Sequence, residues 1–263
     1  MSEPDYDPRR FRGNVPFYLR YRLGYPDLLI DRIAAVAGLR VGEAVLDLGT
    51  GPGLLAVPFA RGGMAVTAID PEPDMLAVLR ERAVEERVSL DVRVGSSFEM
   101  PPHIGPFRLV TIGRAFHWMD RAATLDRLDR LIAKGGAVAL LHDDHPSTAE
   151  NAWRGVLREL ADRYGGRSDA QRARISKLYR SHESILLDSA FARLERIGVI
   201  VQRELDADAI VGLGYSLSAL SPDRLGARAP EFEKELRAEL ARLSPDGRFT
   251  EIAELSALIA KRG

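Results

Sequence analysis

The stretch Val45-Leu-Asp-Leu-Gly-Thr-Gly-Pro-Gly53 decides the fold of this 263-residue chain. An apolar pair leads into an acid, and alternating glycines follow. The apolar start is typical of a strand buried in a parallel sheet, and the glycines permit positive φ, so a ligand can lie against the main chain. Residues 54–60 then read as a helix whose free N–H groups would face the same ligand. The pattern predicts a nucleotide-type site.

The glycine spacing argues against a nicotinamide or flavin cofactor. The dinucleotide fingerprint has its third glycine three residues after the second, whereas Leu54 occupies that position here and Gly53 comes one residue earlier. Asp47 lies beside the glycine turn, where its carboxylate would repel a pyrophosphate and attract an ammonium or sulfonium group. The motif therefore favours a positively charged nucleoside.

A second acid, Asp70, ends the next apolar run, residues 65–69. It lies about twenty residues beyond the glycine turn, where this architecture places the acid that accepts hydrogen bonds from ribose hydroxyls. The alternative is that Asp70 only caps the helix that begins near Pro73. Because the glycine turn precedes it, we expect the ribose role.

The composition excludes several classes of function. The chain has no cysteine, which rules out disulfides, metal thiolates and a thiol nucleophile. The formal net charge of −1 offers no general attraction to nucleic acid or to an anionic membrane. The first residues are acidic with no apolar run behind them, and no stretch is long and apolar enough to span a membrane. We expect a cytoplasmic protein.

Strand and helix patterns alternate through the first half of the chain, which predicts an α/β fold with a doubly wound, mostly parallel sheet. Gly135-Gly136 is expected to turn into the fifth strand. Ligands bind beyond the carboxyl ends of such strands, where Asp47, Asp70 and Arg114 would meet. The expected strands are 44–48, 65–69, 89–94, 109–113 and 137–141, and the expected helices include 73–85 and 120–133.

The regular alternation of strand and helix patterns ends after His145. Apolar stripes predict one helix through residues 153–164 and another through 232–240, with Pro230 before the second. A helix is also expected over 169–187, then a strand at about 198–204 and a helix that Asp206 would cap and that runs through Leu217. The end of the chain, residues 249–263, fits a strand or a helix equally well.

Ordered motifs carry a family resemblance, namely Asp47–Gly53, Ala68-Ile-Asp70, the loop at Gly95 and Phe116-His-Trp118. They are similar to those of the class I S-adenosylmethionine-dependent methyltransferases, and most like the bacterial small-molecule group that contains the trans-aconitate and quinone-biosynthesis enzymes.

The resemblance implies a Rossmann-like fold with a seven-stranded sheet and S-adenosylmethionine as the cofactor. It divides the chain into a cofactor-binding core with an N-terminal lid (1–145), a mainly helical substrate cover that includes the sixth strand (146–248) and a final antiparallel core strand (249–263).

The resemblance also implies roles for the loop residues. Asp47 would orient the methionine part of the cofactor, and Asp70 would hold the ribose. Met75 would lie against the adenine or simply pack in the core. Many relatives have an acid at Ser96 or Ser97, so adenine recognition would depend here on Ser97 and Phe98. The loop itself would be shaped by Gly49, Thr50, Gly51 and Gly53.

The segment before the first strand resembles the family's leader, with Tyr18, Arg22 and Tyr25 at matching positions. In the family this segment folds over the cofactor. Arg22 would hold the cofactor carboxylate, since guanidinium pairs well with carboxylate, or it is a surface arginine beside packed tyrosines.

Residues after the fourth and fifth strands are the candidates for chemistry. Arg114 would offer its backbone carbonyl beside the sulfonium, and its side chain would meet an acidic substrate or form a salt bridge. His117 is either the base or a packing residue. Trp118 and Tyr215 would line the acceptor pocket. In His142-Asp-Asp-His145 we expect no metal site, and His142 is a substrate-contact candidate.

The predicted reaction is methyl transfer to a small-molecule acceptor by in-line displacement at the S-methyl carbon. A tRNA or protein methyltransferase would need a different motif after the fourth strand or a basic stripe. A non-catalytic S-adenosylmethionine-binding sensor or scaffold stays open. The acceptor and the oligomeric state do not follow from the sequence.

Overall fold

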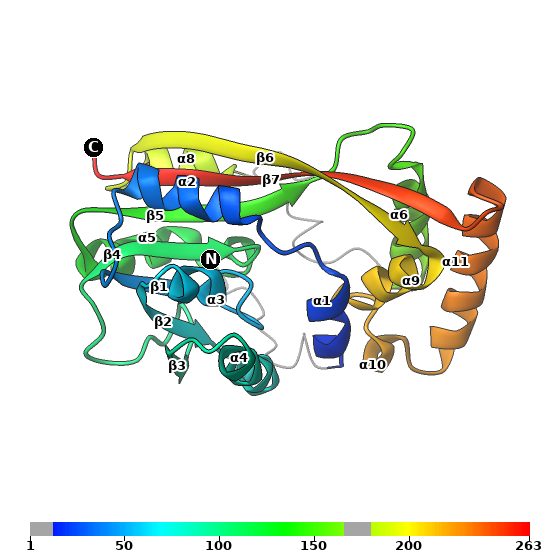
Figure 1. The fold of residues 1–263 in the computed structure, drawn as a ribbon, viewed down its shortest axis with the longest axis horizontal. Coiled ribbons are helices and arrows are strands. Elements are labelled where there is room, and N and C mark those ends of the chain that lie inside the picture. The colour runs from blue at the N-terminus through cyan, green and yellow to red at the C-terminus, as the bar shows by residue number, and fades with distance from the viewer. Residues whose placement is uncertain (1–12, 166–179) are drawn as a thin grey trace.

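A computed structural model describes residues 13–165 and 180–263, and it confirms the α/β fold class. One seven-stranded sheet has the order β3-β2-β1-β4-β5-β7-β6 (Figure 1). The first five strands pair in parallel, and β7 runs antiparallel to both of its neighbours. The strands are β1 (Ala44–Leu48), β2 (Ala65–Asp70), β3 (Leu90–Val94), β4 (Phe107–Gly113), β5 (Ile132–Asp144), β6 (Arg193–Asp206) and β7 (Arg248–Lys261).

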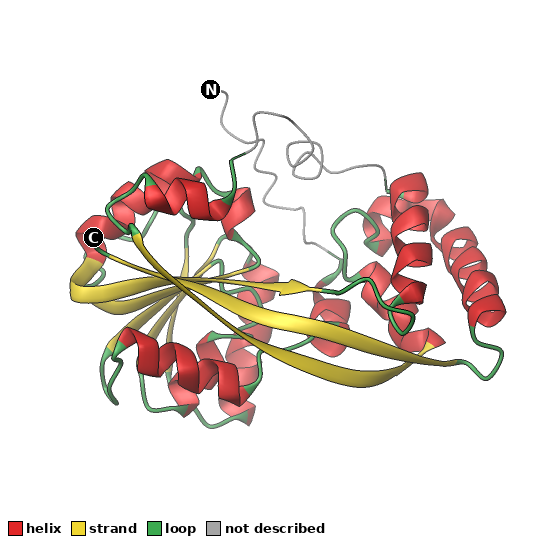
Figure 2. Cartoon of the chain, turned by 90° about the horizontal axis from the view of Figure 1, so that it is seen from above, coloured by secondary structure: helices red, strands yellow, loops and turns green. Residues whose placement is uncertain are grey.

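Helices cover both faces of the sheet (Figure 2). Helices α2 (Asp27–Ala37), α3 (Ala56–Arg61) and α4 (Pro73–Glu85) bury their apolar residues on one face. Helices α5 (Arg121–Leu131) and α8 (His182–Leu187) pack on the other. Local sequence sets the helix ends, because Pro73 occupies the first turn of α4 and the Asp120 side chain accepts from the Ala123 N–H at the start of α5.

The last two strands extend far beyond the others as a two-stranded ribbon. Each has 14 residues, and they pair over their full length. β5 pairs with β7 only from Glu254 onward, so the Arg248–Ala253 part of β7 lies outside the core sheet. A helical lobe with its own apolar core sits on this far end (Figure 1). It contains α6 (Ala152–Tyr164), α9 (Ala207–Tyr215), α10 (Pro222–Leu225) and α11 (Ala229–Leu243).

Helix α1 (Val15–Tyr21) lies between the core and this lobe (Figure 1). It packs against α9, where a Cβ on Gly212 would come within 2.2 Å of the Tyr21 ring. Phe17 contacts the Tyr215 ring at 5.2 Å between centroids. The leader is thereby fixed to the lobe as well as to the core.

Several elements differ from their sequence-based bounds. The sixth strand is Arg193–Asp206, much longer than 198–204, and the final segment is a strand. Gly135-Gly136 does not turn into the fifth strand but lies within β5, where Gly135 has a φ of 74° and the register with β4 shifts. The expected helix 169–187 falls largely outside the described residues. Its last part is α8, which packs on the core sheet rather than in the lobe.

Candidate functional site

The glycine loop after β1 combines close packing with one open position. Gly49, Gly51 and Gly53 all have positive φ. A Cβ on Gly49 would lie 2.7 Å from the Ala115 Cβ, and one on Gly53 would lie 2.2 Å from Leu79 Cδ1. At Gly51 a Cβ would meet nothing within 4 Å. Gly49 and Gly53 therefore let the loop pack on its neighbours, whereas Gly51 leaves main chain open to a ligand.

Asp47 is buried at the end of β1, with only 1% of its surface exposed. Its carboxylate accepts hydrogen bonds from the hydroxyls of Thr50 (2.6 Å) and Thr111 (2.8 Å). Burial raises the pKa of Asp47 to about 6, and the two hydroxyl donors limit that rise. The side chain is thus a fixed carboxylate beside the loop that a cationic ligand would keep ionised.

Asp70 ties the glycine loop to the end of β2. Its carboxylate accepts from the Gly51 N–H (2.8 Å) and the Glu72 N–H (2.9 Å). Burial raises the pKa of Asp70 to about 6, while these two amides lower it. Glu72 is itself the N-cap of α4, and neither amide belongs to the first turn of that helix, so Asp70 does not cap it. The ribose role stays a prediction.

A pocket opens where the carboxyl ends of β1 and β4 meet the leader. Within the described part of the chain, the buried Tyr25 hydroxyl and the Arg114 Nη1 in its wall have no hydrogen-bond partner. Such buried donors are costly unless a ligand or water satisfies them. The lining comes from Tyr18, Tyr25, Asp47, Gly49, Thr50, Gly51, Pro52, Leu54, Leu55, Gly113 and Arg114.

Arg114 joins the pocket wall to the end of β5. Its backbone has a φ of 55°, and its guanidinium donates to Asp143 Oδ1 and to the Leu23 carbonyl, both at 2.8 Å. The same group lies over the Tyr25 ring at 4.9 Å. Burial alone would raise the pKa of Asp143, but Arg114 and Arg22 lower that pKa to about 2. The Arg114 side chain therefore forms the salt bridge that the sequence offered as one alternative.

Other predicted cofactor residues lie outside the pocket lining. Arg22 donates from Nε to Ser216 Oγ at 2.9 Å and lies over the Tyr18 ring. Met75 is buried in the first turn of α4. Ser97 is buried, and its carbonyl accepts from Arg127, while Phe98 next to it is half-buried. Their predicted roles stay untested.

The candidates for chemistry are dispersed. His117 and Trp118 share the 3₁₀ turn η1 (Phe116–Trp118), with ring centroids 4.5 Å apart. His142 contacts Ser256 Oγ at 3.1 Å. Burial together with Arg196 lowers its pKa. Tyr215 is buried in the core of the lobe, and its hydroxyl donates to Glu233. None of these four lines the pocket described above.

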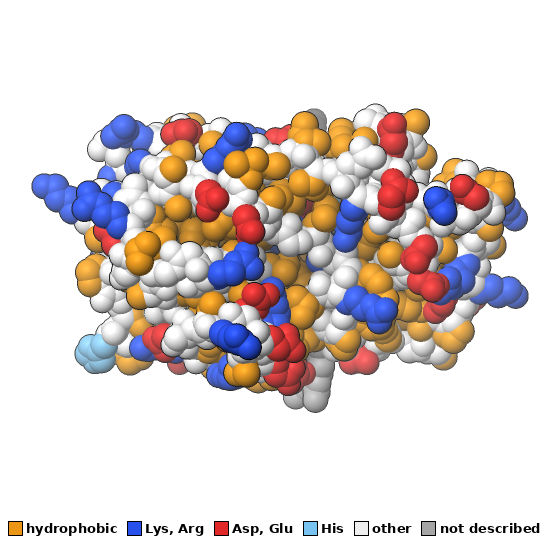
Figure 3. Space-filling view, viewed as in Figure 1, with side chains coloured by type: hydrophobic (Ala, Val, Ile, Leu, Met, Phe, Trp, Pro, Cys, Tyr) orange, Lys and Arg blue, Asp and Glu red, His pale blue; other side chains and the backbone are white. Residues whose placement is uncertain are grey.

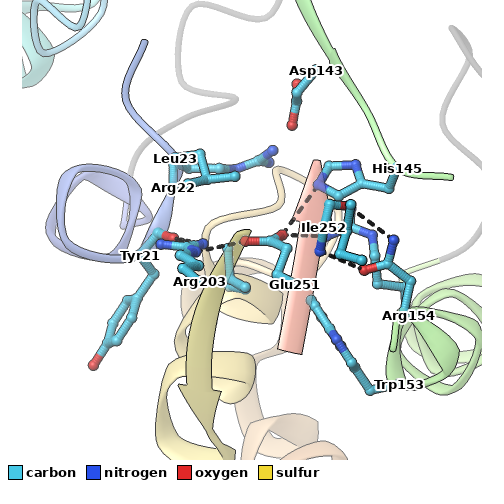
Figure 4. Close-up of polar contacts among 12 residues, drawn as sticks. Tyr21, Arg22, Leu23, Asp143, His145, Trp153, Arg154, Arg203, Glu251 and Ile252 are labelled. Carbon is cyan, nitrogen blue, oxygen red and sulfur yellow. Dashed lines mark hydrogen bonds and ion pairs between the residues drawn. The ribbon is translucent and has the colours of Figure 1, made fainter. Parts of the chain in front are cut away.

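Sequence reasoning missed a cluster around Glu251, which is only 2% exposed (Figure 4). Arg203 donates to Glu251 Oε2 at 2.6 Å, Arg154 to Oε1 at 2.8 Å, and His145 Nε2 lies 3.1 Å from Oε1. Burial would raise the pKa of Glu251, but His145 and Arg203 hold that pKa below its usual range. The available signal was a charged residue where the period-two pattern of β7 calls for an apolar one. Tyr25 and Thr111 were missed as site residues too.

Asp47 makes the stability of the protein depend on pH. The folded state keeps its proton up to about pH 6, whereas an unfolded chain releases it near the ordinary value of 3.8. Stability from this group therefore falls as pH rises through that window, by up to about 3 kcal/mol. Compared with the wild type, Asp47→Asn should gain stability between about pH 4 and pH 6 in urea unfolding, and the difference should level off above that range. Parallel pH profiles for the two proteins would contradict this.

Two further observations bound the kind of site. Among the described helices, none combines the length and apolar character needed to cross a membrane. In residues 13–165 and 180–263 no group of three or more His, Asp or Glu side chains is arranged to hold a metal ion. His142 and His145 contact different partners, Ser256 and Glu251.

Comparison with known proteins agrees with this geometry. Residues 45–136 match the family model described as a methyltransferase domain. An uncharacterized methyltransferase of Mycobacterium tuberculosis is 32% identical over 166 residues, which is 63% of each chain. A ubiquinone biosynthesis O-methyltransferase of Xanthomonas oryzae is 36% identical over 113 residues, 42% of this chain and 47% of the relative. The chain thus spans less than two thirds of the length of these relatives.

Solved structures share the fold. A putative type II methyltransferase from Anaeromyxobacter dehalogenans has a TM-score of 0.58 at 22% identity, covering 92% of this chain and 98% of that one. An S-adenosylmethionine-dependent methyltransferase from Geobacter sulfurreducens, in complex with S-adenosylhomocysteine, has a TM-score of 0.51 at 21% identity, covering 98% and 99%. Residues 45–136 therefore resemble a methyltransferase domain in sequence, and the chain shares its fold with these solved methyltransferase structures.

Proposed function

We propose that this chain transfers a methyl group from S-adenosylmethionine to a small-molecule acceptor. The supporting observation is the pocket at the ends of β1 and β4, which is lined by Asp47 and by Gly51, whose N–H donates to the Asp70 carboxylate. The unpartnered Tyr25 hydroxyl and Arg114 Nη1 in the pocket wall fit a ligand that brings hydrogen-bond acceptors. These residues suit a nucleoside with a cationic amino-acid tail.

Different residues are proposed to bind different parts of the cofactor. Asp47 is proposed to face the cationic part of the cofactor, and Asp70 to accept from its ribose. Tyr18 and Tyr25 cover the pocket from the leader side. Arg22 is proposed to bind the carboxylate of the cofactor. Met75, Ser97 and Phe98 form the adenine side of the same proposal.

S-adenosylmethionine supplies a methyl group on a positively charged sulfur, which an acceptor heteroatom or carbanion displaces in line. The protein then has mainly to position the acceptor and exclude water, and positioning alone contributes several kcal/mol. Arg114 offers its backbone at the wall where the acceptor would enter. His117 acts as a base only for a poor nucleophile, and otherwise packs on Trp118. We place Trp118 and His142 on the acceptor side.

A small-molecule acceptor is favoured over nucleic acid by the surface charge. The formal net charge is −1, and on the face drawn in Figure 3 the positive and negative side chains are interspersed. A phosphate backbone calls instead for a basic stripe. A cytoplasmic location belongs to the same proposal and is supported by the absence of cysteine.

The first experiment is calorimetry with S-adenosylhomocysteine and, separately, NADH. We expect one site for S-adenosylhomocysteine and no binding of NADH. Methyl transfer from tritiated S-adenosylmethionine is then assayed with a small-molecule extract, tRNA and a protein extract. Label in the small-molecule fraction supports the proposal, and label in tRNA or protein instead would replace it. Binding without transfer to any fraction would favour a sensor or scaffold.

A further inference from the structure

The cluster around Glu251 carries more positive than negative charge. Arg154 and Arg203 both pair with this single buried carboxylate, and His145 adjoins it. Arg22 and Arg158 add positive potential at Arg154, while Glu251 and Asp143 are the acids that act on it. Asp143 already pairs with Arg114. Charges taken partly out of water are costly unless they are compensated, so this surplus calls for an anion.

Two of these guanidinium groups have donors to spare. Arg154 uses only Nη1, toward Glu251, and Arg22 uses only Nε, toward Ser216, for hydrogen bonds within the described residues. Their remaining nitrogens are not among the buried unpartnered atoms, so solvent reaches them. Arg203, in contrast, also donates to the Tyr21 carbonyl and is held at both ends. Arg154 is the side chain best placed to hold an incoming anion.

The cluster lies where the cofactor pocket gives way to the helical lobe. Arg22 follows α1, His145 follows β5, and Arg154 is on α6. Figure 4 shows the Arg22 side chain extending toward the side of the cluster where Asp143 and His145 lie. Asp143 links this side to the pocket through its ion pair with Arg114. A ligand held by Arg154 would thus lie between the pocket and the lobe.

We propose that Arg154, with His145 beside it, binds a carboxylate or phosphate group of the methyl acceptor. The planar fork of a guanidinium group matches the geometry of either anion. That the bound anion belongs to a methyl acceptor rests on the proposed function. That an anion binds here rests on the charged cluster alone. The site selects acidic acceptors and directs their other end toward the cofactor pocket.

Matched pairs of ligands test this site. Benzoate and benzamide, succinate and succinamide, and phenyl phosphate are titrated by calorimetry into the full chain, with and without S-adenosylhomocysteine. We expect an acid to bind at least tenfold more tightly than its amide. Arg154→Met should remove this preference and leave amide binding unchanged, because a hydrogen bond to a charged group accounts for roughly a tenfold to hundredfold difference. Comparing the affinity for phenyl phosphate with the affinity for benzoate identifies the preferred anion.

The matched control is Arg158→Met, which makes the same change at an exposed position one turn further along α6. Arg158 contributes only part of the potential at Arg154 and is not proposed to contact the anion, so this variant should keep most of the preference for acids. Arg154→Lys retains the charge without the fork and should keep part of the preference, which provides a second variant if Arg154→Met does not fold. The proposal is overturned if the wild type binds no acid more tightly than its amide. It is also overturned if Arg154→Met weakens the binding of acids and amides equally, because that is the effect expected of a residue with a purely structural role.

The two proposals fail separately. A preference for acids in a protein that does not bind S-adenosylhomocysteine would keep the anion site and remove the methyltransferase proposal. Binding of S-adenosylhomocysteine with no preference for acids would keep the methyltransferase proposal and remove the anion site.

Discussion

Gly51→Ala is expected to weaken binding of S-adenosylhomocysteine by roughly tenfold to a hundredfold, the usual cost of forcing an extra methyl group into a packed contact. In the protein itself a Cβ at this position meets nothing within 4 Å. The added methyl group would instead project into the space where the ligand lies against the main chain. Calorimetry measures the affinity, and thermal denaturation measures the accompanying change in stability.

Gly247 provides the control for backbone strain. It also has positive φ, 71° against 54° at Gly51, and a Cβ there likewise meets nothing within 4 Å. Both substitutions should cost about 1–2 kcal/mol in stability, because a Cβ disfavours the left-handed region. Only Gly51→Ala should affect the cofactor. Equal affinities in the two variants would mean that no ligand contacts the loop at Gly51.

Glu251→Ala is expected to destabilise the protein by about 3–5 kcal/mol, which is typical when one partner of a buried ion pair is removed. The variant leaves Arg154 and Arg203 facing each other without the carboxylate that both contact. For a chain of this size the midpoint of thermal unfolding should fall by about ten degrees.

Glu254→Ala makes the same change three residues along β7, at an exposed position with no ion pair within the described residues. It should shift the midpoint by little, since exposed charges contribute less than about 1 kcal/mol. If both variants unfold at the same temperature, the Glu251 cluster contributes nothing to joining the lobe and the core.

The sheet and the glycine loop were predictable because local sequence determines them. Apolar runs that end in Asp47 and Asp70 specify parallel strands, and Pro73 marks the first residue of α4. The length of β5 was not predictable, because Gly135-Gly136 reads as a turn when only neighbours in sequence are considered. In the structure the bulge is maintained by pairing with β4.

The candidate site likewise has a part that was predictable from the sequence and a part that was not. The spacing of Asp47, Gly51 and Asp70 places them together at one sheet edge, and the structure brings all three to the loop. The Glu251 cluster could not be foreseen, since its members come from β6, β7, α6 and the segment after β5, and they meet only through long-range pairing. Tyr215 shows the opposite limit: its aromatic ring was read as pocket lining, whereas the structure buries it in the core of the lobe.

The long pairing of β6 with β7 has a mechanical consequence. Outside the core, Val201–Asp206 and Arg248–Ala253 pair with each other, and among the described strands no third one flanks them there. A two-stranded ribbon twists and bends more readily than a wide sheet. Rocking of the lobe should therefore concentrate in this narrow neck, with the seven-stranded platform staying rigid. The neck contains both Arg203 and Glu251, so their ion pair joins the two strands at the place where bending is expected.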